Sequence, residues 1–365
     1  MGALGNPEAG TELQVSLERE TPSLGTGPYG ACLASVLAVV LSVLAVGGCA
    51  REQTGYTFAL VPKAMNNPFF DFAREGCMQA AADLEDVECL YIGPSEHTEA
   101  DQIQVVEDLI TRRVDGIAVS PSNATAMARA LARANEIGIP VITWDSDLLA
   151  EDAALRTTYI GTENRAMGVE QAKLLQKLKP DGGTICIQSG GAAAMNHNER
   201  MQGFRDTLAG ADSGEPPGER LEGTNGWTEV AACPLYTNDD FPLAVQQMAD
   251  ILASEPDLDV FSITGGFPQF VDQAYRQAVE PYRERIESKD LVIIGADVLP
   301  MQLDLLAEGL SHGQVGQRPY AMGYRSMEVL LQLVAGLSVE DPIYTGLDVL
   351  TSADDVEAFR ARQGG

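Results

Sequence analysis

Two aspartates follow apolar runs that have the composition of buried strands, where a carboxylate could meet a ligand. Asp145 follows the run Val141–Trp144, and Asp297 follows Leu291–Gly295 after one alanine. An ionised carboxylate accepts hydrogen bonds from hydroxyl groups, and such charged bonds contribute about 1.5–3 kcal/mol each. Polar donors nearby are expected to keep both aspartates ionised. Taken singly, each aspartate could equally be a helix cap.

Amide, guanidinium and aromatic side chains elsewhere could complete such a site. Asn67, Phe69 and Phe70 stand together where the first predicted strand passes into a helix. Aromatic rings stack on the apolar C–H faces of a sugar, and amides both donate to and accept from its hydroxyls. The alternative is that both phenylalanines are core residues at the start of the helix. Arg200 and Gln317 add donors, although Arg200 alone could form a surface ion pair.

Short apolar runs alternate with segments of helical periodicity, which indicates repeated strand–helix units. The runs end at Pro, Gly, Ser or Asp, as buried parallel strands do, and ligands bind such sheets at the carboxyl ends of strands. We therefore predict an α/β protein with two Rossmann-like, doubly wound parallel-sheet lobes, and a surface excursion over 209–226. The predicted strands are 58–61, 89–92, 116–119, 141–144, 184–188, 230–236, 260–263 and 291–295, and helices are expected near 163–179, 197–209, 241–254, 268–280 and 300–309.

The amino-terminal region has features of an export signal. Residues Ala31–Gly48 carry no charge and would extend about 27 Å as a helix, enough for the core of a secretory signal. Small residues then precede Cys49, and this ending resembles the lipobox of bacterial lipoproteins. We expect residues 1–48 to be a lipoprotein signal peptide, Cys49 to carry the lipid and residues 49–55 to be a linker. An uncleaved anchor is the alternative, and the usual basic start is missing, since only Arg19 precedes the apolar run.

The chain is strongly acidic and holds few metal-ligand side chains. It has 53 Asp and Glu against 24 Lys and Arg, a net charge of −29 in 365 residues, which would repel the phosphates of a nucleic acid. The histidines, His97, His197 and His312, stand far apart in the sequence, and the cysteines lack the paired spacing of a zinc site. We expect no nucleic-acid partner, no metal and no cofactor.

One family resemblance connects these features. It rests on Asn-Asn-Pro-Phe-Phe at 66–70, Val-Ile-Thr-Trp-Asp at 141–145, Asn-Glu-Arg-x-x-Gly-Phe at 198–204, Ile-Ile-Gly-Ala-Asp at 293–297 and Gln317. From about Tyr56 to Leu350 the chain resembles the periplasmic sugar-binding proteins of the ribose-binding type, which share the type I periplasmic binding fold with sugar-responsive repressors. The resemblance implies two lobes joined by three crossings at a hinge, with the ligand held in the cleft. The N-terminal lobe would comprise 56–161 plus 318–345, and the C-terminal lobe 162–317 plus 346–365.

The resemblance also implies which residues line the cleft, and departures from the family pattern affect the ligand. Ser146 stands where ribose binders have an arginine, Thr264-Gly265-Gly266 where an asparagine is expected, and Asn238-Asp239-Asp240 where an aromatic residue is expected. These departures favour another pentose, hexose or small polyol over ribose. The expected ligand-binding set, with Trp144 and Thr264 added at points of departure, is Asn67, Phe69, Phe70, Trp144, Asp145, Arg200, Thr264, Asp297 and Gln317.

Four cysteines remain if the signal peptide is lost and Cys49 is acylated. An even number in an oxidising compartment favours disulfides, with three pairings open. The resemblance places Cys186 and Cys233 on adjacent strands, and Cys77 and Cys89 on a helix and the strand after it. These are the two bridges that it indicates.

The resemblance implies a binding protein and no enzyme. We expect a monomeric, lipid-anchored protein of the cell envelope, periplasmic or extracytoplasmic, that delivers a monosaccharide to the permease of an ABC importer. A ligand-sensing partner of a membrane receptor or sensor kinase is the alternative. A glycosidase with Asp145 and Asp297 as its paired carboxylates is less favoured, because the histidines offer no base and no GxSxG or P-loop motif is present. A repressor role is disfavoured because no basic helix-turn-helix precedes the predicted fold.

Overall fold

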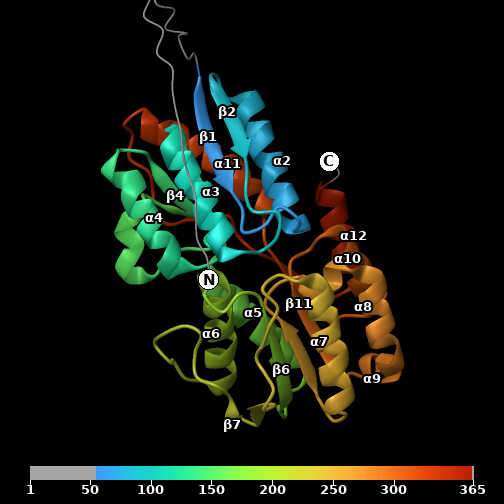
Figure 1. Ribbon diagram of the computed structural model, residues 1–365. Helices are drawn as coiled ribbons and strands as arrows, with labels where there is room; N and C mark the ends of the chain where they lie inside the picture. The colour runs from blue at the N-terminus through green and yellow to red at the C-terminus, as the bar shows by residue number, and fades with distance from the viewer. Residues whose placement is uncertain (1–54, 364–365) are drawn as a thin grey trace, which may run out of the picture. The chain divides into compact units, whose positions relative to one another are not determined.

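Two largely parallel β-sheets, each with helices on both faces, organise the chain (Figure 1). The computed structural model describes residues 55–363, so the predicted signal peptide over 1–48 and the lipidation of Cys49 lie outside the described residues. The two sheets confirm the prediction of two doubly wound α/β lobes. Within 55–363, no helix is both long and apolar enough to cross a membrane.

The first sheet has six strands in the order β13-β5-β4-β3-β1-β2, and all its pairs are parallel. Its central strands are apolar along their whole length because helices cover both faces of the sheet. The strands are β1 (Tyr56–Val61), β2 (Val87–Tyr91), β3 (Gly116–Val119), β4 (Val141–Trp144), β5 (Tyr159–Gly161) and β13 (Ile343–Tyr344).

Helices α2 (Pro68–Asp83) and α11 (Pro319–Val334) share one apolar core with this sheet, and α3 (Glu99–Arg112) and α4 (Ala124–Glu136) share another. The side chain of Asn67 caps α2 by accepting a hydrogen bond from the backbone N–H of Phe69 at 3.0 Å. A short 3₁₀ helix, η1 (Ala150–Leu155), precedes β5.

The second sheet runs in the order β14-β12-β11-β10-β6-β8-β7, and β9 also pairs with β6. A continuous strand over 230–236 was predicted here, and this prediction is wrong. The segment turns after β8 and joins β6 again only at β9, because Pro234 has no N–H to give to a ladder. The strands are β6 (Gly183–Ser189), β7 (Glu222–Thr224), β8 (Trp227–Glu229), β9 (Leu235–Tyr236), β10 (Val260–Ile263), β11 (Val292–Ala296), β12 (Gly313–Gly316) and β14 (Asp348–Leu350).

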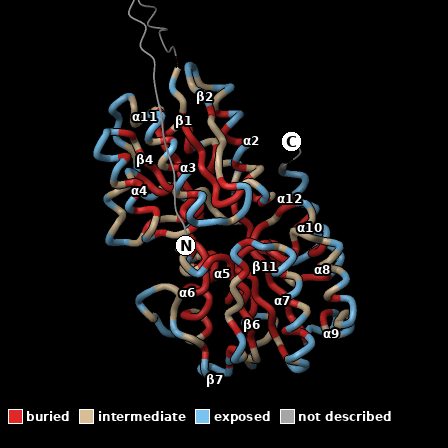
Figure 2. Tube along the Cα trace, viewed as in Figure 1, coloured by how far each residue is buried: buried red, intermediate tan, exposed pale blue. Residues whose placement is uncertain are grey.

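Helices cover both faces of the second sheet, and the buried residues concentrate along the strands of both sheets (Figure 2). One face packs against α5 (Asn164–Leu178) and α6 (Met195–Ala209), and the other against α7 (Phe241–Ser254), α8 (Asp272–Val279) and α9 (Arg283–Glu287). The remaining elements are α10 (Pro300–Ala307), α12 (Ala353–Gln363) and the 3₁₀ helices η2 (Phe267–Phe270) and η3 (Glu280–Tyr282).

The chain passes between the two sheets three times, after β5, after β12 and after β13. Arg318, in the second crossing, donates to both carboxylate oxygens of Asp348 at 2.9 and 3.2 Å, and Asp348 begins β14 after the third crossing. This bidentate pair ties two crossings together. The sheets thus divide as the resemblance implies, and the exact lobe boundaries stay a prediction.

Two disulfides brace the sheets. Cys77 of α2 is bonded to Cys89 of β2, with their Cα atoms 5.9 Å apart. Cys186 of β6 is bonded to Cys233, in the turn before β9, with their Cα atoms 5.3 Å apart. The second bridge fixes the turn that interrupts the predicted strand.

Candidate functional site

The two strand-end aspartates lie at matching places in the two lobes. Asp145 directly follows β4 and Asp297 directly follows β11, and their side chains are almost fully buried. Both have positive φ angles, 57° and 73°, which non-glycine residues adopt at a cost. Such strain persists where the surrounding structure fixes it, and it concentrates at functional sites.

The carboxylate of Asp145 joins groups from both lobes. Its Oδ2 accepts a hydrogen bond from Ser120 Oγ at 2.7 Å and lies 3.5 Å from Lys63 Nζ. Asn196, from α6 of the second lobe, donates its Nδ2 to Asp145 Oδ1 at 3.2 Å and accepts from Lys63 Nζ at 2.8 Å. Lys63, Asp145 and Asn196 therefore form a buried triangle across the junction of the lobes.

Arg200 and Gln317 form a second buried network within reach of the first. The side chain of Arg200 is 1% exposed, so the surface ion pair considered for it is wrong. Its Nη2 donates to Gln317 Oε1 at 2.7 Å, and its Nη1 donates to the carbonyl oxygen of Thr264 at 2.9 Å. Gln317 Nε2 in turn donates to Asp297 Oδ1 at 2.7 Å. These bonds fix the guanidinium and Asp297 relative to each other.

Burial shifts the ionisation of several groups at the site. It raises the pKa of Asp297 to about 6, against the opposing effects of Arg200 and Gln317. The polar neighbours were expected to favour the ionised form of both aspartates. At Asp297 desolvation outweighs these donors and raises the pKa, and a pKa of about 6 still leaves the carboxylate mostly ionised at pH 7. Burial also lowers the pKa of Lys63, and it lowers the pKa of His197 well below its usual value, which leaves the imidazole neutral at pH 7.

The aromatic residues of the first lobe serve both core and site. Phe69 and Phe70 are 4% and 2% exposed and belong to the core under α2, yet both also line the cavity between the lobes. Trp144 was expected to line the cleft, but it does not line the cavity. Its side chain is fully buried and packs edge-on against Phe70, with ring centroids 5.5 Å apart. Alternation along β4 places Trp144 on the same face as Ile142, toward the core shared with α2 and α11.

Thr264 also stands behind the cavity lining and does not line it itself. Its hydroxyl lies 3.0 Å from His197 Nδ1, and its carbonyl binds Arg200, so it positions both side chains. The next two residues, Gly265 and Gly266, do line the cavity. A Cβ at either position would collide with an aromatic ring of η2, namely Phe267 or Phe270. The glycines therefore allow these two rings to face the cleft.

The cavity at this junction is small and mixes charged, amide and aromatic groups. Its volume is about 20 Å³, close to what one or two water molecules occupy. The lobes meet through side chains that satisfy one another, as the Lys63–Asn196–Asp145 triangle does. The residues that line the cavity are Lys63, Asn67, Phe69, Phe70, Asp145, Asn196, His197, Arg200, Asp239, Gly265, Gly266, Phe267, Phe270, Asp297 and Gln317.

Comparison with known proteins identifies the family. Residues 58–338 match the family model described as a periplasmic binding protein domain. The chain belongs to this family. The ribose import binding protein RbsB of Salmonella typhimurium is 23% identical over 307 residues, covering 83% of this chain and 94% of the relative.

Solved structures of sugar complexes resemble this periplasmic binding protein over most of its length. A solute-binding protein of an ABC transporter from Burkholderia graminis, in complex with D-arabinose, has a TM-score of 0.71 and 28% identity, and the match covers 82% of this chain and 96% of that one. Another from Agrobacterium vitis, with bound D-fucose, has a TM-score of 0.71 and 26% identity, covering 81% and 95%. The ribose-binding type and its two-lobed fold, expected from the sequence, are confirmed, and these relatives are named as binding proteins and not as enzymes.

Several residues of this periplasmic binding protein reach the cavity although sequence reasoning did not select them. His97 and His197 are far apart in the sequence, yet both lie beside Asp239, with His97 Nδ1 at 3.2 Å from Asp239 Oδ2; of the two histidines, only His197 lines the cavity. Asn196 and Lys63 also come from opposite lobes. The position of Lys63 near the end of the first strand was a signal that could have been used, whereas the histidine pair depends on lobe closure. No group of three metal-ligand side chains occurs among residues 55–363.

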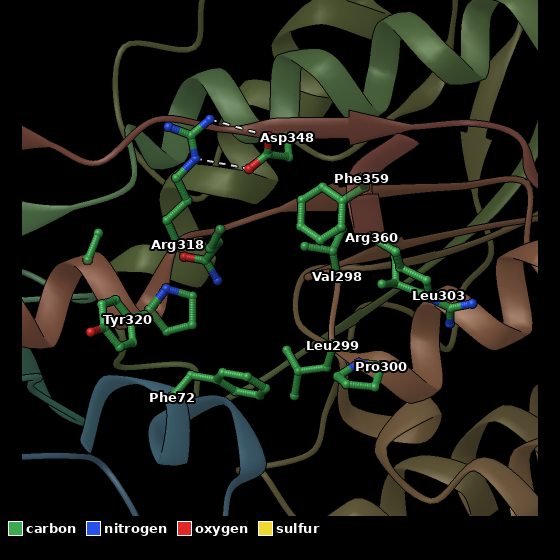
Figure 3. A pocket seen from close by; sticks show the side chains of 13 residues that line it. Phe72, Val298, Leu299, Pro300, Leu303, Arg318, Tyr320, Asp348, Phe359 and Arg360 are labelled. Atoms are coloured by element: carbon green, nitrogen blue, oxygen red, sulfur yellow. Dashed lines mark hydrogen bonds and ion pairs between the residues drawn. The ribbon is translucent and has the colours of Figure 1, made fainter. Parts of the chain in front are cut away.

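A larger cavity of about 470 Å³ lies at the crossings and shares Gln317 with the smaller one (Figure 3). Phe72 of α2, Leu299 and Phe359 of α12 give it a mainly apolar lining, and the paired Arg318 and Asp348 stand at its edge. It holds few unpaired polar groups, so it lacks the donors and acceptors that a polyol needs. The smaller cavity is the better candidate for a sugar site.

Proposed function

We propose that this periplasmic binding protein captures a monosaccharide, namely a pentose, hexose or small polyol, between its lobes and delivers it to an ABC importer. One observation carries the proposal. Buried carboxylates, amides and a guanidinium from both lobes converge with four phenylalanine rings on one cavity at the carboxyl ends of the strands. Hydroxyls need the polar groups, and the C–H faces of a sugar ring need the aromatic ones. Asn67, Asp145, Arg200, Asp297 and Gln317 are the proposed polar contacts.

Relatives support the sugar class without fixing the sugar. The similar proteins are named for ribose, D-arabinose and D-fucose, which differ in ring size and hydroxyl pattern. Ser146 follows Asp145 here, and the cation nearest this carboxylate is Lys63, which offers a point charge in place of a guanidinium fork. This change supports a sugar other than ribose.

Sugar binding must open the junction, because a cavity of about 20 Å³ cannot hold a pyranose. Asn196 accepts from Lys63 and donates to Asp145 across the lobes. A sugar hydroxyl can also both accept and donate, so it is the natural replacement for the amide in both bonds. When a hydroxyl replaces the amide, Lys63 and Asp145 keep the number of hydrogen bonds that they make to Asn196. Lobe opening, followed by closure on the sugar, is therefore the proposed binding step.

The proposal includes no reaction on the sugar. Asp297, with a pKa of about 6, is the feature that a glycosidase would use as its proton donor. Its Oδ1, however, already accepts from Gln317, and the relatives of the chain are named as binding proteins. Capture and release of a sugar require no such proton donor.

An extracytoplasmic place in the cell envelope follows from the family, and the anchor is a further proposal. We propose that residues 1–48 are removed as a signal peptide and that Cys49 carries the lipid, on the evidence of the uncharged run before this cysteine. A monomer that presents both lobes to an importer permease fits these features.

The test is a thermal-shift screen of the purified protein against pentoses, hexoses and polyols, followed by sugar uptake in a gene-deletion strain. A sugar that binds only the folded state raises the melting temperature. The proposal expects at least one such sugar and loss of its uptake in the deletion strain. If the deletion strain still takes up the sugar but loses a transcriptional or chemotactic response to it, the function is sensing and not import. Absence of any stabilising sugar would overturn the sugar site.

A further inference from the structure

One carboxylate of the cavity has a buried oxygen that no group within residues 55–363 binds. Asp239 lies in the turn after β9, is 5% exposed and lines the cavity. Its Oδ2 lies 3.2 Å from Nδ1 of His97, which comes from the loop between β2 and α3 of the opposite lobe. This is a close polar contact and not a well-aligned hydrogen bond, since Nδ1 of His97 has no hydrogen-bond partner of good geometry among the described residues. Oδ1 of Asp239 is likewise buried without a hydrogen-bond partner in this part of the chain. An unsatisfied buried acceptor is costly, so this oxygen is prepared for a donor.

The turn fixes the direction of this side chain. Asn238 and Asp239 both have positive φ, 49° and 56°. The hydroxyl of Thr237 accepts a hydrogen bond from the backbone N–H of Asp239 at 3.1 Å, and the N–H of Thr237 donates to Ser189 at 2.9 Å. Two successive strained residues held in this way indicate a constraint on where the carboxylate points.

The surrounding charges keep Asp239 ionised. Burial raises its pKa, but His97 and Lys63 reverse that effect and bring the pKa to about 2. Lys63 itself donates to Asn196, and His197 is neutral beside Thr264. His197 and Asp239 both pack closely against the backbone of Gly190, where a Cβ would lie 2.6 Å from His197 Nε2 and 2.9 Å from Asp239 Oδ1. None of these neighbouring side chains donates to Oδ1, so this oxygen can accept a hydrogen bond from a ligand.

We propose that Asp239 is a specificity-determining residue, whose Oδ1 accepts a hydrogen bond from one hydroxyl of the bound sugar while His97 orients Oδ2 from the other lobe. The inference rests on the proposed function and narrows its ligand to sugars with a hydroxyl at that position. A site with a buried carboxylate acceptor rejects the analogue that lacks the hydroxyl, because the acceptor is then left unpaired. An aromatic residue at this position would favour a C–H face instead.

The experiment is a calorimetric comparison of the best-binding sugar with its monodeoxy analogues, one for each hydroxyl. The wild-type protein should bind one analogue about 10- to 100-fold more weakly than the parent sugar through this contact. Asp239→Ala should weaken the parent by a similar factor but bind that single analogue as the wild type does, and Asp239→Asn, which tolerates the positive φ, should give an intermediate loss. Asp240→Asn is the matched control, because Asp240 is exposed and caps α7, where asparagine caps equally well.

The role of His97 as a positioning residue has its own comparison. His97→Asn keeps an N–H near Asp239 and should retain most of the affinity, whereas His97→Leu should lose about as much as Asp239→Asn. Wild-type affinity for the parent sugar in the Asp239 variants would overturn the inference and leave the proposed function standing. An equal loss for the parent and all analogues would do the same, since it would assign Asp239 a structural role. If the wild type binds no sugar, the proposed function fails and the inference falls with it.

Discussion

Asp297 provides a direct test of the electrostatics of the site in the ligand-free protein. Burial raises its pKa from 3.8 to about 6, which corresponds to about 3 kcal/mol at 1.36 kcal/mol per pH unit. An acid with a higher pKa in the folded chain binds its proton more tightly there. The stabilisation that protonated Asp297 gives the folded state is therefore fully present below pH 4 and is lost as the pH rises through 6.

The perturbation is Asp297→Asn, which keeps the shape of the side chain and an oxygen for the bond from Gln317 Nε2 at 2.7 Å. The variant carries no buried charge at any pH. We expect it to be more stable than the wild type at pH 8 by up to about 3 kcal/mol, with most of this gain gone at pH 4. Relaxation around a buried group reduces such values, so 3 kcal/mol is an upper bound.

The assay is urea unfolding of both proteins at pH 4, 5, 6, 7 and 8, with the midpoint and the slope compared at each pH. Glu340→Gln makes the same chemical change at an exposed position and controls for the loss of one negative charge. A variant that is less stable than the wild type at pH 8 would refute the reasoning. So would a difference in stability that is equal at pH 4 and pH 8.

Three further outcomes follow from the packing and the networks. Asp145→Ala leaves Lys63 and Asn196 without their common acceptor, and calorimetry should record a loss of about 2 kcal/mol or more in sugar binding. Phe70→Ala should cost about 3–5 kcal/mol of unfolding free energy in urea titrations, because the ring is 2% exposed in the core, and an unchanged midpoint would contradict its core role. Replacing both cysteines of a bridge by serine should lower the free energy of unfolding in urea titrations by about 4 kcal/mol for Cys186–Cys233 and about 3 kcal/mol for Cys77–Cys89. The difference is expected because the two bridges close loops of 47 and 12 residues. A larger loss for the Cys77–Cys89 pair would contradict this argument.

The strands of the two sheets could be predicted where helices cover both faces. Runs such as 116–119 and 260–263 are buried at every position, so their continuous apolar sequence is a sufficient signal. The prediction failed over 230–236, where the apolar residues serve two short strands and a turn. A single apolar pattern cannot distinguish these arrangements, although Pro234 argued against a central strand.

The site could be predicted only in part, because part of it forms where the lobes meet. Asp145, Asp297 and Arg200 are recognisable from their local motifs, and the structure brings them to one junction. The contact of Lys63 with Asn196 joins positions 133 residues apart in the sequence. No local pattern specifies such a pair, since it depends on how the lobes pack.

Trp144 shows a different limit of sequence reasoning. Its neighbour Asp145 faces the cavity, and proximity in sequence suggested that the indole does as well. Strand alternation sends Trp144 into the core with Ile142, and the positive φ of Asp145 turns the chain at the strand end. The residue supports the site from behind, through the ring of Phe70.

The most direct test of the sugar site is isothermal titration calorimetry of the ligand-free protein with a panel of pentoses, hexoses and small polyols. The account predicts that one sugar binds at a ratio of one per chain with a Kd near micromolar, about −8 kcal/mol. The same titration of Asp145→Ala should show binding weakened by more than tenfold. A panel in which no sugar gives saturable heat, or a variant that binds the sugar as tightly as the wild type, would contradict the account.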